Sequence, residues 1–102
     1  MILQLRADTV NIVEANDCGR LHVGTTLAAS AIDAALRATG SGRLLDERTA
    51  LLDLEVLRAR AGAAADVADW DERWRSLIGH ARRAGWLSAD GRDVQAHIEV
   101  VP

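Results

Sequence analysis

The sequence of 102 residues contains no lysine, phenylalanine or tyrosine, and it has a single cysteine and a single proline. Without lysine the chain has no amine for a Schiff base and no Walker-type phosphate loop. Without tyrosine it has no phenolic acid, and the few aromatic rings, Trp70, Trp74 and Trp86, offer little for stacking on nucleic-acid bases. All 12 cationic side chains are arginines, which is typical of GC-rich bacterial genes.

The chain also lacks any stretch close to the roughly 18 consecutive apolar residues of a membrane span. Its first residues do not resemble a secretory signal. The lone Cys18 cannot form an internal disulfide, so we expect a cytoplasmic protein. A hydrophobic fraction of 49% with 26% charged residues predicts one folded domain. The formal charge of −3 disfavours general binding to nucleic-acid phosphates.

The clearest element is a helix predicted from Asp66 to Gly85. Its apolar residues recur at spacings of three and four, which places them on one helical face: Val67, Trp70, Trp74, Leu77, Ile78, Ala81 and Ala84. Acidic residues gather at its N-terminal end and arginines come later, which suits the helix dipole. Gly85 predicts the end of the helix, because glycine adopts the left-handed conformation of a C-cap easily.

Residues 2–24 are rich in Ile, Leu and Val and predict short strands at 2–6 and 9–15. The residues 16–19, Asn-Asp-Cys-Gly, predict a turn that pairs the second strand with a third one ending near Val23. Thr25 and Thr26 are expected to cap a following helix over 27–39.

The segment 44–61 contains no glycine or proline, and we interpret it as a helix. Its apolar residues do not gather on one helical face, and Leu52, Leu54 and Val56 also alternate with charged residues as they would in a strand. A helix that is apolar on several sides is buried from several sides. The segment is therefore either the centre of the domain or half of a subunit interface.

At the C-terminal end, Asp90 and Gly91 predict a turn, and a strand with alternating apolar residues follows from Val94 to Val100. The order of elements predicts an α+β fold. We expect a small antiparallel sheet, made of the N-terminal hairpin plus the C-terminal strand and covered by about three helices.

Histidine is the usual acid–base residue near neutral pH, and His22 and His97 both fall on the polar face of predicted strands. If these strands are neighbours, the two rings and a carboxylate, Glu14 or Glu99, form a candidate ligand-binding or proton-transfer site. The simpler interpretation is two unrelated surface histidines. His80 is explained by a favourable position near a helix C-terminus.

Other candidate sites have equally plain structural explanations. Trp70 with Arg73 are candidates for lining a ligand pocket, although tryptophans at helical spacing more often form core. Cys18 has no visible partner to activate it as a nucleophile. The segments 24–26 and 40–43 contain glycine and precede or follow helices, but neither matches a known phosphate-binding motif.

The last helix, the Asp90-Gly91-Arg92 turn and the strand after it resemble the last helix and wing of a winged-helix DNA-binding domain. The resemblance covers about the last third of the chain. It implies DNA contacts through Arg73, Arg75, Arg82, Arg83 and Arg92. The chain departs from that family in its N-terminal hairpin, its net negative charge and the acidic residues on the same helix.

No motif of a catalytic class is present, so we expect a protein that is not an enzyme and that needs no cofactor or metal. The all-round apolar segment 44–61 favours a small protein–protein interaction or accessory domain that forms a homodimer or binds a protein partner. Two alternatives remain open, a winged-helix-like nucleic-acid binder and a small ligand-binding protein or enzyme that uses His22 and His97.

Overall fold

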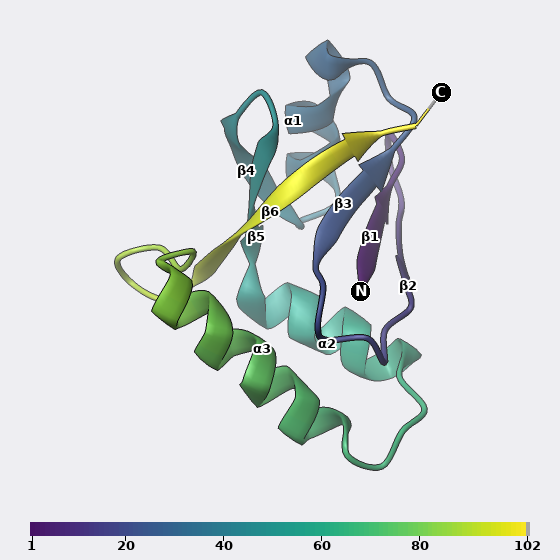
Figure 1. Cartoon of the computed structure of the whole chain (residues 1–102). Helices are drawn as coiled ribbons and strands as arrows, with labels where there is room; N and C mark the ends of the chain where they lie inside the picture. The colour runs from purple at the N-terminus through teal and green to yellow at the C-terminus, as the bar shows by residue number, and fades with distance from the viewer. Residues whose placement is uncertain (102) are drawn as a thin grey trace.

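The computed structural model describes residues 1–101, which form a six-stranded sheet and three helices (Figure 1). In chain order the elements are β1 (Ile2–Leu5), β2 (Val10–Val13), β3 (His22–Thr25), α1 (Ala29–Ala38), β4 (Gly42–Asp46), β5 (Thr49–Asp53), α2 (Leu54–Ala64), α3 (Trp70–Ala84) and β6 (Asp93–Val100). Within this part of the chain, no helix has the length and apolarity needed to cross a lipid bilayer.

The sheet is mixed, with the strand order β2-β1-β3-β6-β5-β4. The central strands β1, β3 and β6 run parallel to one another, whereas β2 pairs antiparallel with β1, and β5 pairs antiparallel with both β6 and β4. The expected small antiparallel sheet is therefore wrong, although the α+β class holds. Parallel neighbours need long crossover connections, and these connections carry β2, the helices and the β4–β5 hairpin.

One face of the sheet forms the core. Residues that pair across the strands present the same face, and the core-facing positions are Leu3, Leu5, Val23, Ala50, Leu52, Val94, Ala96 and Ile98. The buried residues of all three helices join these side chains in one cluster. The opposite face carries polar positions such as Gln4, His22 and His97, which lie outside the cluster. The helices therefore cover a single face.

The predicted hairpin across residues 16–19 is wrong. β2 pairs instead with β1, through a turn in which the Arg6 N–H donates to the Thr9 carbonyl at 2.9 Å. After β2 the chain passes through Glu14, whose φ of 54° is left-handed, and then buries Ala15 and Cys18. This loop crosses to the other side of β1 and packs into the core, so its Asn, Asp and Gly residues do not close a hairpin.

The helix predicted over 44–61 is wrong in its first part, because residues 44–53 contain the end of β4 and all of β5, and only residues 54–61 belong to a helix, α2. Ala50, Leu51 and Leu52 are consecutive buried residues of β5, so this strand does not show the alternation of a half-exposed strand. Asp53 then caps α2, since its side chain accepts a hydrogen bond from the Val56 N–H at 3.0 Å.

The sequence predicts α3 well, but it predicts the wrong cap for α1. The predicted helix and its end are confirmed in α3, with Trp70, Trp74, Leu77 and Ala81 on the buried face and Gly85 as a left-handed C-cap with a φ of 78°. The predicted start at Asp66 is wrong, because α3 begins at Trp70, so Val67 precedes the helix, and Ala84 is exposed. The predicted threonine cap of α1 is wrong, because the Thr25 hydroxyl donates to the Leu5 carbonyl at 2.9 Å and accepts from the Leu27 N–H at 3.1 Å. Thr25 thus links β1 to β3, and α1 begins after Ala28.

Candidate functional site

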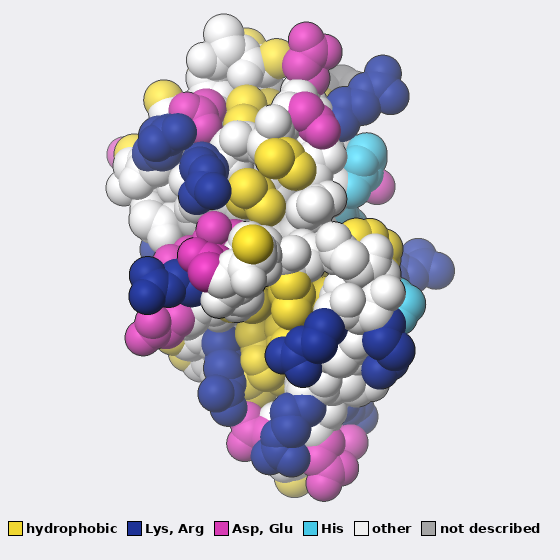
Figure 2. Space-filling view, turned by 90° about the vertical axis from the view of Figure 1, so that its left-hand side faces the viewer, with side chains coloured by type: hydrophobic (Ala, Val, Ile, Leu, Met, Phe, Trp, Pro, Cys, Tyr) yellow, Lys and Arg dark blue, Asp and Glu magenta, His cyan; other side chains and the backbone are white. Residues whose placement is uncertain are grey.

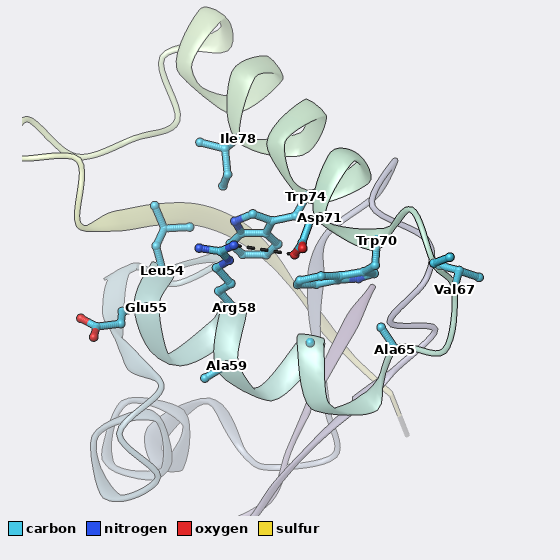
Figure 3. A pocket seen from close by; sticks show the side chains of 12 residues that line it. Leu54, Glu55, Arg58, Ala59, Ala65, Val67, Trp70, Asp71, Trp74 and Ile78 are labelled. Atoms are coloured by element: carbon cyan, nitrogen blue, oxygen red, sulfur yellow. Dashed lines mark ion pairs between the residues drawn. The ribbon is translucent and has the colours of Figure 1, made fainter.

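A groove of about 740 Å³ lies between α2 and α3 (Figure 3). On α2 its wall includes Leu54, Arg58 and Gly62, which are four residues apart and therefore share one helical face. On α3 the wall is formed by Trp70, Asp71, Trp74 and Ile78. The connection between the helices, with Ala65, Val67 and Ala68, closes one end.

The two tryptophans form the deep part of this groove. Their rings stack with centroids 5.5 Å apart and an interplanar angle of 24°. The Trp70 indole N–H donates to the Ala15 carbonyl at 2.8 Å, which ties α3 to the loop after β2. A Cβ on Gly62 would lie 3.4 Å from the Trp70 ring, so the absence of a side chain lets the ring lie against α2. Trp70 and Trp74 are only 7% and 5% exposed, and the groove is therefore a rigid feature of the core edge.

The rim of the groove carries opposite charges from the two helices. Arg58 on α2 reaches toward Asp71 on α3, with 3.7 Å between Nη2 and Oδ1 (Figure 3). The two side chains are 57% and 66% exposed, so the ion pair contributes little to stability and can exchange for another partner. Glu55 also lines the rim.

The outer surface shows the same combination of apolar and charged groups. Figure 2 shows a strip of hydrophobic side chains that sinks between flanking arginines and ends near a group of acidic side chains. The acidic residues near the start of α3 are Asp66, Asp69, Asp71 and Glu72, and the arginines of its second half are Arg82 and Arg83. The groove is thus apolar inside and charged at its edges.

Of the two residues predicted to line a pocket together, Trp70 belongs to the groove and Arg73 does not. The Arg73 guanidinium lies 3.1 Å from the Asp69 carboxylate and donates to the Asn16 carbonyl at 3.2 Å. It borders a different hollow, of about 470 Å³, beside Cys18. Burial raises the pKa of the Cys18 thiol above its ordinary value, which works against a reactive thiolate.

The predicted histidine pair does lie on neighbouring strands, since His22 of β3 and His97 of β6 are in register. His22 Nε2 is 3.5 Å from the Glu99 carboxylate, whereas Glu14 follows β2 on the far side of β1. The two rings border different hollows, of about 660 and 760 Å³, and Glu99 borders both. Among residues 1–101, no group of three His, Cys, Asp or Glu side chains is arranged to hold a metal ion. A ligand site on these histidines stays a prediction.

The resemblance to a winged helix does not extend to the fold. A wing is a free hairpin, but β6 lies inside the sheet and pairs with β3 on one side and β5 on the other. Asp90 and Gly91 do form the expected turn, in which the Gly91 N–H donates to the Ser88 carbonyl at 2.9 Å. Nucleic-acid contact by Arg73, Arg75, Arg82, Arg83 and Arg92 stays a prediction without this structural support.

The glycine-containing segment 40–43 joins three elements. Ser41 is buried, and its hydroxyl accepts a hydrogen bond from Arg60 Nη1 of α2 at 2.8 Å. Arg60 also donates to the Thr39 carbonyl at the end of α1. Through these contacts the segment connects α1, β4 and α2.

His80 also has a packing contact, because its ring approaches Trp86 edge-on with 5.2 Å between ring centroids.

The sequence analysis misses the wall of the groove on α2, including Leu54, Arg58 and Gly62. The signal that could have found them is Asp53, a good N-cap residue directly before three positions spaced by four. When the helix is predicted to start at residue 44, its apolar residues do not gather on one side, so these three positions do not stand out as one face.

No protein-family model matches the chain, and comparisons with curated proteins and with solved structures find no match either. Its function is therefore inferred from the geometry of its own surface.

Proposed function

We propose that this protein is a protein-interaction module that binds an apolar segment of a partner protein in the groove between α2 and α3. The observation that carries the proposal is the groove itself, in which an apolar interior built on Trp70 and Trp74 opens beside exposed charges. Grooves between helices are a common docking place for amphipathic helices, whose apolar side chains act as anchors.

The composition of the walls supports a protein partner. Ala59, Gly62 and Ala68 are small and exposed, so the backbone of a partner segment can approach closely. Leu54, Ile78 and Val67 supply apolar contacts at the edges. The rim ion pair between Arg58 and Asp71 is exposed enough to open and re-form with charges on the partner. Apolar contact surrounded by charged groups is the usual organisation of a specific interface.

The module is proposed to act in the cytoplasm and by binding alone. Its one thiol, Cys18, is buried and has a raised pKa, so it needs no oxidising compartment for disulfide formation. A single helix over 44–61, apolar on several sides, does not support a homodimer, because only residues 54–61 of this segment are helical. The proposal depends on the α2–α3 groove in its place.

The experiment uses 8-anilinonaphthalene-1-sulfonate, a dye that fluoresces in apolar sites, as the probe for the groove. Ala59→Leu fills the groove from α2, and we expect it to weaken dye binding by about tenfold. Ala63→Leu is the matched control, since Ala63 is also exposed on α2 but does not line the groove. Saturable dye binding that Ala59→Leu leaves unchanged would show that the groove is not an apolar binding site.

A further inference from the structure

A stripe on α3 borders the groove and carries charges in a self-complementary order. Asp71, Arg75, Ile78 and Arg82 are spaced by four, three and four residues, which places them on one side of the helix. Asp71 and Ile78 also line the groove. Along the edge of the proposed binding surface, the stripe therefore presents an acidic, a basic, an apolar and a second basic side chain in this order.

Two of these charges lack a partner within the protein. In the described residues 1–101, neither Arg75 nor Arg82 has a carboxylate within 4.0 Å. Both are exposed on α3, and Asp71 has only its exchangeable contact with Arg58. The stripe consequently offers two free cations and one carboxylate that can change partner.

The spacing of the stripe is symmetric about the midpoint between Ser76 and Leu77. Asp71 lies as far before this midpoint as Arg82 lies after it, and Arg75 lies as far before it as Ile78 lies after it. A two-fold axis at the midpoint, with a second copy of α3 running antiparallel, would bring each Asp71 opposite the partner's Arg82. Each Ile78 would meet the aliphatic stem of the partner's Arg75. A parallel arrangement would place every charge of the stripe opposite its own copy, whereas in the antiparallel arrangement only the two Arg75 side chains approach each other across the axis.

We infer that a second copy of the chain docks along this α3 edge of the groove, through antiparallel α3 helices with the Asp71–Arg82 pair formed twice. This inference rests on the proposed function of the groove, because it names the protein partner that the groove edge recognises.

The expected dimer is weak. α3 has 15 residues and is about 22 Å long, so two such helices cover less than the roughly 800 Å² per partner of a standard interface. We therefore expect self-association with a dissociation constant in the micromolar range, favoured by low salt because its charged pairs are exposed. Sedimentation velocity of the full chain, at about 5 to 500 µM protein, measures this equilibrium.

The decisive variants exchange the paired charges. Asp71→Arg and Arg82→Asp should each weaken dimerisation by about tenfold or more, because like charges then meet at two symmetric places. The double variant Asp71→Arg/Arg82→Asp should restore the constant to within about threefold of the wild type. Arg83→Asp is the matched control, since Arg83 is also a cation of the last turn but lies off the stripe. It should change the constant by less than about twofold.

Circular dichroism of each variant checks that exposed charge exchange leaves the fold intact. A wild-type protein that stays monomeric at about 500 µM, or a double variant no better than the single ones, would overturn the second copy as the partner. Dye binding distinguishes a failure of the second-copy inference from a failure of the proposed function of the groove. If the dye binds in the groove and Ala59→Leu weakens its binding while the protein is monomeric, the groove function stands and only the second copy as its partner is wrong. If the dye result fails, the proposed function fails as well.

Discussion

At the scale of single residues, Trp70 and Trp74 serve two purposes at once. Their stacked rings belong to the core cluster, and the same rings form the deep part of the α2–α3 groove. Because both indoles are almost completely buried, the groove cannot reshape itself by moving them without a cost in core packing. A rigid floor lowers the conformational entropy that a partner must overcome on binding.

Truncation of one of these rings should strongly destabilise the fold. Trp74→Ala removes a large side chain that is 5% exposed, and we expect a loss of about 3 to 5 kcal/mol in the free energy of unfolding. Trp86→Ala, the control at a ring that is 43% exposed, should cost less than about 1 kcal/mol. Urea unfolding followed by circular dichroism measures both. Equal losses for the two variants would mean that Trp74 is not a core residue.

Gly42 at the start of β4 has a requirement that no other residue type meets. Its φ is 152°, and a Cβ there would lie 1.9 Å from the Leu51 carbonyl oxygen of the paired strand. Gly42→Ala must therefore push the β4–β5 hairpin apart, at an expected cost of about 3 kcal/mol. Gly40→Ala, with a φ of 68° and no atom within 4 Å, should cost only about 1 kcal/mol. Thermal unfolding of the two alanine variants tests this order, and the reverse order would contradict it.

At the scale of elements, the sequence predicts those whose apolar residues lie on one side. α3 and β6 each bury a regular set, at helical spacing in α3 and at every second residue in β6, and both were found. β5 buries Ala50, Leu51 and Leu52 in succession, and the turn before it contains Glu47 and Arg48 in place of glycine or asparagine. Because neither the spacing of its apolar residues nor its turn residues indicate a hairpin, the sequence alone predicts a helix for this segment.

The sequence likewise predicts only part of the candidate site, namely its wall on α3. Trp70, Trp74 and Ile78 were expected on one face of α3, which is correct, but the opposite wall belongs to α2 and was lost with the wrong helix start. The neighbouring positions of His22 and His97 were foreseen from the polar faces of their strands. The sequence does not predict that the two rings border separate hollows, because this depends on which side chains from other elements surround each ring.

The contact between α1 and β4 should make stability depend on pH. Asp33 of α1 accepts a hydrogen bond from the Leu44 N–H at 2.9 Å and pairs with Arg37 at 2.8 Å. The hydrogen bond from Leu44, followed by that from Arg37, lowers the pKa of the Asp33 carboxyl below its ordinary value. A carboxyl with a lowered pKa stabilises the fold fully above its unfolded value of about 3.9, and this stabilisation is lost as the pH falls through the folded value.

The stability advantage of the wild type over Asp33→Asn should therefore be largest near neutral pH and should shrink in acid. Urea unfolding of both proteins at about pH 6 and about pH 3 gives the two differences. Asp46 and Asp90 also have lowered pKa values, through backbone and side-chain hydrogen bonds in their turns, but they are present in both proteins and drop out of the comparison. A difference that stays constant across this range would show that Asp33 has no linked stabilising role.

At the scale of the whole molecule, the order of strands is the feature that the sequence could not specify. Where a strand alternates, the alternation indicates which side chains point to the core, and this is correct for Leu3 and Leu5 of β1 and for Val94, Ala96 and Ile98 of β6, but not for Val100, which is 59% exposed. It does not indicate which strand lies next to which, or in which direction. The joining of both chain ends in one sheet was expected, but the parallel pairing of β3 with β6 depends on how α1, the β4–β5 hairpin, α2 and α3 are accommodated between them.

This topology makes β6 the strand that holds the sheet together. It pairs with β3 on one side and with β5 on the other, so it alone connects the group β2-β1-β3 to the hairpin of β4 and β5. A disturbance on the core face of β6 should therefore affect both halves at once. Ala96 faces that core at 3% exposure and is in register with Ala50, whereas the adjacent His97 points to the open face.

Ala96→Asp would bury a carboxylate that has no partner, at an expected cost of about 3 kcal/mol or more against a total stability of about 5 to 15 kcal/mol. His97→Asp places the same group one residue further on, at the surface, and should change stability by less than about 1 kcal/mol. Hydrogen exchange of the strand amides shows the consequence for the whole sheet. In Ala96→Asp, protection should fall in β1 and β5 together, because each half of the sheet loses the strand that connects it to the other. If protection fell in β6, β3 and β5 but stayed high in β1, the β2-β1-β3 half would be stable without β6, and the prediction for the whole sheet would be wrong.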